Sequence, residues 1–98
     1  MALSPKAQKR IGLNKKAVEK LTKVLPKLKT AEESRQFLQD LMSSSEILDL
    51  ARRLMATKLL FEGKTYQEIE DLLGMGPLTI NKIHFKTRGS KILPTLIS

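Results

Sequence analysis

The chain has 98 residues, a formal net charge of +8, and neither cysteine nor tryptophan. This length suits one small domain or one subunit of an intertwined assembly, and the missing cysteines exclude disulfides, thiolate chemistry and cysteine-ligated zinc. No apolar run reaches the roughly 20 residues that span a bilayer, and no signal-peptide core follows the basic start. We therefore expect a cytoplasmic protein with no membrane partner.

Charge is distributed unevenly along the chain. Residues 1–29 hold nine basic side chains and one acidic, residues 30–72 hold five basic and nine acidic, and residues 73–98 hold four basic and none acidic. Two positive ends favour a polyanionic partner. Nucleic acid fits better than an anionic membrane surface, because the lysine-rich N-terminal helix lacks the bulky aromatic residues of an interfacial helix.

The first segment, residues 1–13, combines Lys6, Lys9 and Arg10 with small and polar residues. We expect a basic flexible arm there. A disordered tail without function explains the same composition equally well.

A helix is expected next, with Asn14 as its N-cap. Its apolar residues recur at spacings of three and four and form a narrow stripe between lysines: Val18, Leu21, Leu25 and Leu28. Such a stripe suits packing on another helix. Pro26 should kink or end this helix, because proline removes one backbone hydrogen bond.

Three Ser/Thr-x-x-Glu capping boxes then indicate helix starts. They are Thr30 with Glu33, Ser43 with Glu46, and Thr65 with Glu68. The first precedes the apolar residues Phe37, Leu38, Leu41 and Met42. The second predicts the longest helix, over about residues 44–62, which Gly63 ends.

Residues 66–85 have the pattern of a helix-turn-helix. Gly74 suits the left-handed position that ends the first helix, and Pro77 suits the first turn of the second. The residues expected where the two helices touch are Ile69, Leu73, Met75, Ile80 and Ile83. An αα-hairpin used only for packing is the alternative. Since no segment alternates like a strand, we predict an all-α fold of five to six helices.

The C-terminal tail is apolar but interrupted by Pro94. Its residues Ile92, Leu93, Leu96 and Ile97 should cover a groove on this subunit or on a partner. The apolar stripes of the earlier helices exceed what a thin monomer covers, so we predict an intertwined homodimer. The predicted organisation is an arm (1–13), a helical dimerisation core (14–62), a helix-turn-helix unit (63–88) and a tail (89–98).

The outward face of the second motif helix is the predicted contact with double-stranded DNA. Asn81 suits adenine, Lys82 suits guanine or a phosphate, and Leu78 suits a thymine methyl group. The full predicted set is Lys64, Gln67, Pro77, Leu78, Thr79, Asn81, Lys82, Phe85 and Lys86. An ordinary solvated helix face is the alternative, but it leaves Leu78 and Phe85 exposed without purpose.

No catalytic or metal-binding pattern is present. His84 has no second histidine, cysteine or suitably spaced carboxylate, so we expect a surface residue. Glu68, Glu70 and Asp71 complement a helix N-terminus. We predict that the protein is not an enzyme.

Five segments carry a family resemblance: Phe37-Leu-Gln-Asp-Leu-Met-Ser, Glu46-Ile-Leu-Asp-Leu-Ala-Arg-Arg-Leu, Leu59-Leu-Phe-Glu-Gly, Tyr66-Gln-Glu-Ile and Thr79-Ile-Asn-Lys-Ile. In this order and spacing, residues 37–86 resemble the Trp repressor family of bacterial transcriptional regulators. The pattern Gly-x-x-Tyr-x-Glu-Ile from Gly63 is closer to the uncharacterised branch of the family than to the tryptophan-sensing one.

The resemblance implies an intertwined helical dimer whose two helix-turn-helix units bind adjacent major grooves. It also implies an effector pocket, for which Ser43, Arg53 and Lys82 are the candidates. Lys82 stands where tryptophan-sensing members have a second arginine, and Ile83 replaces a glycine. Lysine does not stack as a guanidinium does, and isoleucine fills the slot. Both departures count against tryptophan binding, and we predict no cofactor.

The favoured interpretation is a sequence-specific, homodimeric DNA-binding transcriptional regulator that acts as a repressor. The alternative is a non-enzymatic helix-turn-helix module that recruits a protein partner, as sigma-like or antitoxin-like proteins do.

Overall fold

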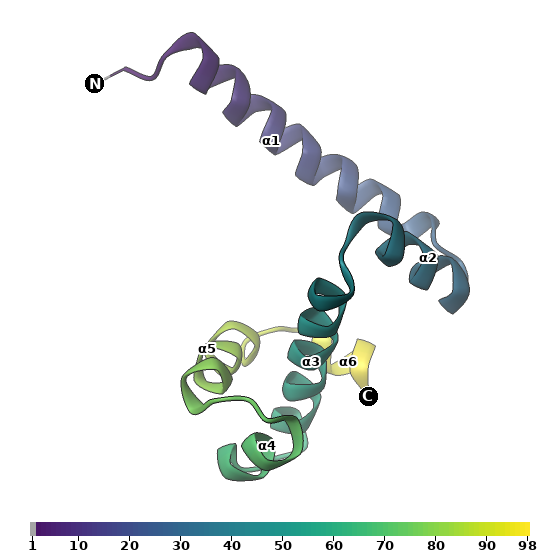
Figure 1. Ribbon diagram of the computed structural model, residues 1–98, viewed down its shortest axis with the longest axis vertical. Coiled ribbons are helices and arrows are strands. Elements are labelled where there is room, and N and C mark those ends of the chain that lie inside the picture. Colours follow the sequence, from purple (N-terminus) through teal and green to yellow (C-terminus); the bar gives the residue numbers. More distant parts are fainter. Residues whose placement is uncertain (1) are drawn as a thin grey trace. The chain divides into compact units, whose positions relative to one another are not determined.

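The structure, a computed structural model, describes residues 2–98 (Figure 1). Six α-helices and one short 3-10 helix make up the regular elements of the described residues, without a strand. The predicted all-α class is confirmed. The chain divides after Leu41 into two compact units. Among the described helices, none is both long and apolar enough to cross a membrane.

The first unit begins with the helix α1, Pro5–Val24, which is 20 residues long. The hydroxyl oxygen of Ser4 accepts a hydrogen bond from the Ala7 N–H at 3.2 Å, and Pro5 occupies the first turn. The expected arm without structure over residues 1–13 and the expected cap at Asn14 are therefore wrong for residues 5–14, whereas residue 1 lies outside the described residues. The expectation that the longest helix follows Ser43 is also wrong.

The helix α1 ends before a proline, as expected. A 3-10 helix, η1 (Leu25–Lys27), contains Pro26 and is followed by α2, Ala31–Leu41. Thr30 caps α2 by accepting from the Glu33 N–H at 3.0 Å. The Glu33 carboxylate reaches back to the Lys29 N–H at 3.3 Å, one residue before the cap. The predicted box therefore forms with a shifted second bond.

No residue in 2–41 is buried. Val18 and Leu21 on α1 are 61% and 45% exposed, and Leu25, the first residue of η1, is 47% exposed. Apolar surface left in water is unfavourable by about 25 cal/mol per Å². The first unit therefore presents an uncovered apolar stripe.

The second unit holds four helices: α3 (Ser44–Phe61), α4 (Tyr66–Leu73), α5 (Pro77–Thr87) and α6 (Leu93–Ile97). Ser43 and Glu46 form the complete predicted capping box at the start of α3, with bonds of 3.2 and 2.9 Å. Gly63, at φ +82°, follows the end of α3. That left-handed conformation is the reason a glycine stands there.

The core of the second unit joins α3 to the helix-turn-helix. Its buried apolar residues are Ala56 from α3, Ile69 from α4, and Ile80 and Ile83 from α5. The predicted contact residues Ile69, Ile80 and Ile83 are confirmed. Because Ala56 belongs to this core, α3 supports the helix-turn-helix in addition to any role in dimerisation.

The tail forms α6, which packs on α3. Leu93 and Ile97 are half-buried, while Ile92 and Leu96 remain exposed. Pro94 and Ile97 line a pocket with Phe61 of α3. The tail thus covers part of α3 on one side and presents apolar residues on the other.

Candidate nucleic-acid interface

The turn between α4 and α5 has the geometry that a helix-turn-helix requires. Thr65 caps α4 by accepting from the Glu68 N–H at 3.1 Å. Gly74 follows α4 at φ +62°, and its N–H donates to the Glu70 carbonyl at 2.8 Å. Gly76 is the N-cap of α5, and Pro77 begins the helix. Each predicted turn residue therefore lies where its conformation is needed.

The two faces of α5 differ sharply in exposure. Ile80 and Ile83 are buried against α3 and α4, and Thr87 on the same side is buried as well. On the opposite side, Leu78 is 77% exposed and Phe85 is 59% exposed. Asn81 and Lys82 on this side are also exposed, as are Thr79 and Lys86 at its flank.

The outward face of α5 continues past its C-terminus. The Arg88 guanidinium lies 4.3 Å from the centroid of the Phe85 ring, a cation–π arrangement. No acidic residue occurs after Asp71. This face therefore combines positive charge with exposed apolar groups, which suits phosphates and base edges together.

The predicted contacts before the turn, Lys64 and Gln67, are exposed near the start of α4. The side-chain amide of Gln67 donates to Asp71 Oδ1 at 3.0 Å within the same helix. All nine predicted DNA-contact residues are thus exposed, with seven on α5.

A polar link between α4 and α5 was not predicted. The hydroxyl of Tyr66 donates to Asn81 Oδ1 at 3.1 Å and lies 2.8 Å from His84 Nδ1. The Tyr66 and His84 rings meet edge to face, with centroids 5.9 Å apart. His84, expected as a surface residue, is half-buried in this contact. Its position one turn from Asn81 on a predicted helix was the only sequence signal.

A second unpredicted contact ties α3 to α4. The Arg52 guanidinium donates to the main-chain carbonyl of Leu73, the last residue of α4. The carbonyls at a helix C-terminus have no donor within the helix, so a cation from another element supplies one.

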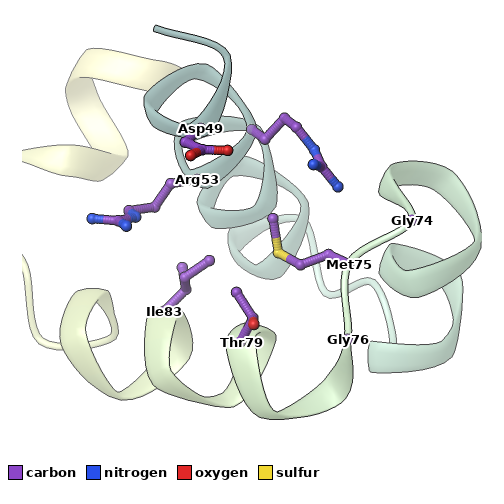
Figure 2. Close-up of a pocket in the computed structure, with 8 residues that line it drawn as sticks. Asp49, Arg53, Gly74, Met75, Gly76, Thr79 and Ile83 are labelled. Atoms are coloured by element: carbon purple, nitrogen blue, oxygen red, sulfur yellow. The ribbon is translucent and has the colours of Figure 1, made fainter. Parts of the chain in front are cut away.

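An open pocket of about 290 Å³ lies between α3 and the turn (Figure 2). Figure 2 shows Asp49 and Arg53 on α3, with Thr79 and Ile83 directed toward them from α5. Its lining residues are Asp49, Arg52, Arg53, Gly74, Met75, Gly76, Thr79 and Ile83.

The three candidate effector residues do not share this pocket. Arg53 lines it, whereas Lys82 lines a neighbouring pocket of about 290 Å³ together with Arg53 and Lys86. Ser43 lies at the start of α3, where its main-chain N–H donates to the Glu46 carboxylate at 2.9 Å. This bond, together with the Ser43 hydroxyl, holds the pKa of Glu46 below its ordinary value of 4.5.

The fold and this site define an all-helical helix-turn-helix protein. Residues 16–96 match the family model of the Trp repressor protein, so the chain belongs to the Trp repressor family, a family of DNA-binding regulators. The membership expected from the five sequence segments is thereby confirmed.

Two relatives agree with this assignment. The chain is 37% identical over 71 residues to the uncharacterized protein YerC of Bacillus subtilis (strain 168), a match that covers 72% of this chain and 68% of YerC. A crystal structure of a TrpR-like protein from Eubacterium eligens ATCC 27750 matches with a TM-score of 0.73 and 29% identity. That match covers 83% of this chain and 84% of the other.

Proposed function

We propose that this protein is a sequence-specific DNA-binding transcriptional regulator that acts as a homodimeric repressor. The observation that carries the proposal is the outward face of α5. It exposes Leu78, Asn81, Lys82 and Phe85, while Ile80 and Ile83 hold the helix on the core.

A helix of this kind reads bases in the major groove. Asn81 offers an acceptor and a donor to adenine, and Lys82 offers a donor to guanine or to a phosphate. Leu78 contacts a thymine methyl group, and Thr79 and Lys86 contact phosphates at the flank. Base contacts and phosphate contacts then come from a single rigid element.

The proposed dimer follows from the apolar surface that the single chain leaves uncovered. No residue in 2–41 is buried, and α1 and the following η1 carry the exposed stripe of Val18, Leu21 and Leu25. Leu48, Leu50 and Leu54 add exposed apolar surface on α3. A second copy covers such faces at low cost and supplies a second α5 for an adjacent half-site.

The test of DNA binding is a fluorescence-anisotropy titration against random duplex DNA at several salt concentrations. We expect micromolar affinity that falls steeply with salt, by about −0.9 in the log–log slope for each phosphate neutralised. Lys82→Ala and Lys86→Ala should each weaken binding and reduce the slope by up to about one unit per subunit. Lys58→Ala, which removes the ion pair between Lys58 of α3 and Glu62 just after it, is the control. A slope near zero for the wild-type protein contradicts the proposal.

The basic residues at the start of α1 are proposed to add phosphate contacts. Because Lys6, Lys9 and Arg10 lie on a helix, replacing all three with glutamine removes their charge and keeps helix-forming residues. The salt slope should fall by up to about three units per subunit. An unchanged salt slope would mean that these three residues do not contact phosphates, and it would not contradict the proposed contacts of α5.

The second candidate function is a protein-interaction module, favoured by the exposed apolar side chains of Leu78 and Phe85. A protein partner would bury both, and binding would depend little on salt. Double substitution of Leu78 and Phe85 with serine discriminates between the two functions. On DNA it should affect base preference and leave the salt slope intact, whereas it should abolish binding to a protein partner.

A further inference from the structure

A hydrogen-bond network joins the two helices of the motif beside the outward face of α5. The hydroxyl of Tyr66, the first residue of α4, lies 3.1 Å from Asn81 Oδ1 and 2.8 Å from His84 Nδ1. Asn81 and His84 are three residues apart on one helix, so a single phenol reaches both. The Tyr66 ring packs against the buried core, which fixes the position of its hydroxyl.

The single hydrogen of the phenol sets the direction of donation. When Tyr66 donates to Asn81 Oδ1, its oxygen remains as the acceptor for a hydrogen on His84 Nδ1. Donation then runs from His84 through Tyr66 to Asn81, and His84 carries its ring hydrogen on Nδ1. The edge-to-face contact of the two rings, at 76°, holds the imidazole in this position.

Held in this way, the Asn81 amide presents Oδ1 to the Tyr66 hydroxyl. One lone pair of Oδ1 accepts from Tyr66, while the other lone pair and both Nδ2 hydrogens stay available. Adenine presents an N6 donor beside an N7 acceptor, and an amide pairs with both only in the matching orientation. An exposed asparagine without such a bond loses rotational freedom when it binds, which weakens the contact.

We propose that Tyr66 is a positioning residue for base recognition, because its hydroxyl holds the Asn81 amide in the orientation that pairs with adenine. This inference rests on the proposed DNA-binding function. It places a specificity determinant on α4, outside the helix that contacts the bases. Tyr66 therefore acts on discrimination at one base pair and not on the electrostatic part of binding.

The test compares base preference in wild type and Tyr66→Phe, which keeps the packed ring and removes only the hydroxyl. Selection from a random duplex pool, repeated with Asn81→Ala, identifies the base pair that Asn81 reads. At that position Tyr66→Phe should lower discrimination by about three- to tenfold, the worth of one hydrogen bond. The salt slope should not change, because no phosphate contact is lost.

Two further variants sharpen this comparison. Tyr66→Phe combined with Asn81→Ala should behave like Asn81→Ala alone, since the hydroxyl acts through the amide. Ser98→Ala, which removes an exposed hydroxyl bond to the Thr95 carbonyl in α6, should change neither preference nor slope. Thermal melts of all variants check that the fold is retained.

A readout without DNA is the tautomer of His84, measured from its ring nitrogen-15 chemical shifts in the free protein. Wild type should show the neutral ring protonated on Nδ1, and Tyr66→Phe should shift the ring toward the Nε2-protonated form. If the wild-type His84 ring is protonated on Nε2, the proposed direction of donation is wrong. The Tyr66 hydroxyl then does not donate to Asn81 Oδ1, and the proposal is overturned.

The outcomes separate this inference from the function on which it rests. Unchanged discrimination in Tyr66→Phe, alongside lost discrimination in Asn81→Ala, overturns the positioning role and leaves the DNA-binding function intact. A wild-type protein without salt-dependent duplex binding overturns the function itself, whatever the His84 tautomer.

Discussion

The guanidinium of Arg52, in the middle of α3, donates a hydrogen bond to the main-chain carbonyl of Leu73 at the end of α4. A helix C-terminus carries partial negative charge and carbonyls without partners, so a cation stabilises it. Gly74 then turns the chain toward α5 in the left-handed conformation. This contact therefore joins α3 to the end of α4, directly before the turn.

Arg52→Leu should therefore loosen the turn of the helix-turn-helix. We expect the free energy of unfolding to fall by about 1 kcal/mol, because a charge-assisted hydrogen bond is lost at a partly buried site. Amide hydrogen exchange at Gly74 should also become faster. Arg53→Leu is the matched control, since Arg53 is the exposed neighbour on the same helix. Equal effects of the two variants in chemical denaturation would contradict a specific role for Arg52.

The two glycines of the turn should respond differently to substitution. Gly74 has φ +62°, with nothing within 4 Å of an added Cβ, so Gly74→Ala meets backbone strain alone. We expect it to destabilise the protein by about 1–2 kcal/mol. Gly76 has φ −73° as the N-cap of α5, a position that serine favours. Gly76→Ser should be neutral or stabilising in thermal melts. If it lowers stability as much as Gly74→Ala does, backbone strain at Gly74 is not the cause of the loss.

The start of α3 should make stability sensitive to acid. The pKa of Glu46 lies below its ordinary value of 4.5, chiefly because its carboxylate accepts from the Ser43 main-chain N–H. A carboxyl with a depressed folded-state pKa contributes stability that is present above its unfolded pKa and is lost as the pH falls through the folded pKa. The stability difference between wild type and Glu46→Gln should therefore be largest near neutral pH and shrink below about 4.5. A stability difference between wild type and Glu46→Gln that grows as the pH falls would contradict this prediction.

The parts of the fold that follow from apolar periodicity were predictable. Ile69, Ile80 and Ile83 repeat at helical spacing around a glycine turn, and all three are buried in the structure. The first turns of α1 were missed because residues 5–13 carry no apolar stripe. That segment is helical through local preferences instead: the cap at Ser4, a proline in the first turn, and a run of good helix formers.

The contacts that shape the site depend on how helices cross, which a sequence pattern does not encode. Tyr66 meets Asn81 and His84 across separations of 15 and 18 residues, and Arg52 meets Leu73 across 21. The outward residues of α5 were predictable because they alternate with buried ones on a single helix. The polar contacts to Asn81 and His84 come from Tyr66 on α4, so only the packed structure identifies them.

The proposed homodimer predicts how the stripe on α1 responds to charge. Leu21→Asp should lower thermal stability and make the melting temperature depend on protein concentration, because an unpaired charge in an apolar interface is unfavourable. Lys23→Asp, on the opposite side of α1, introduces a larger charge change and should leave assembly intact. Sedimentation equilibrium checks the assembly directly. A monomeric wild-type mass, with unfolding independent of concentration, would refute the dimer.

Arg53 and Ile83 line both the pocket between α3 and the turn and the neighbouring pocket that Lys82 lines. Ile83 belongs to the buried core and is only 6% exposed, so its side chain is held in place by packing. The resemblance implies a slot in which two arginine side chains hold the planar indole, and a guanidinium stacks on an aromatic ring as an ammonium does not. The chain offers one guanidinium, from Arg53, and an isoleucine where the resemblance implies a glycine.

We therefore predict that L-tryptophan does not bind and that the protein recognises its operator without it. A ligand shifts a binding equilibrium only when it prefers one state, and the contacts that would supply this preference are missing. Calorimetry of the free protein with L-tryptophan should give no saturable heat, and added tryptophan should leave duplex affinity unchanged. Lys82→Arg restores the second guanidinium but keeps Ile83. If the isoleucine closes the slot, this variant should also give no saturable heat with L-tryptophan. A saturable heat with tighter duplex binding in the wild type would show that the pocket accepts tryptophan despite both substitutions, whereas binding by Lys82→Arg alone would assign the block to Lys82.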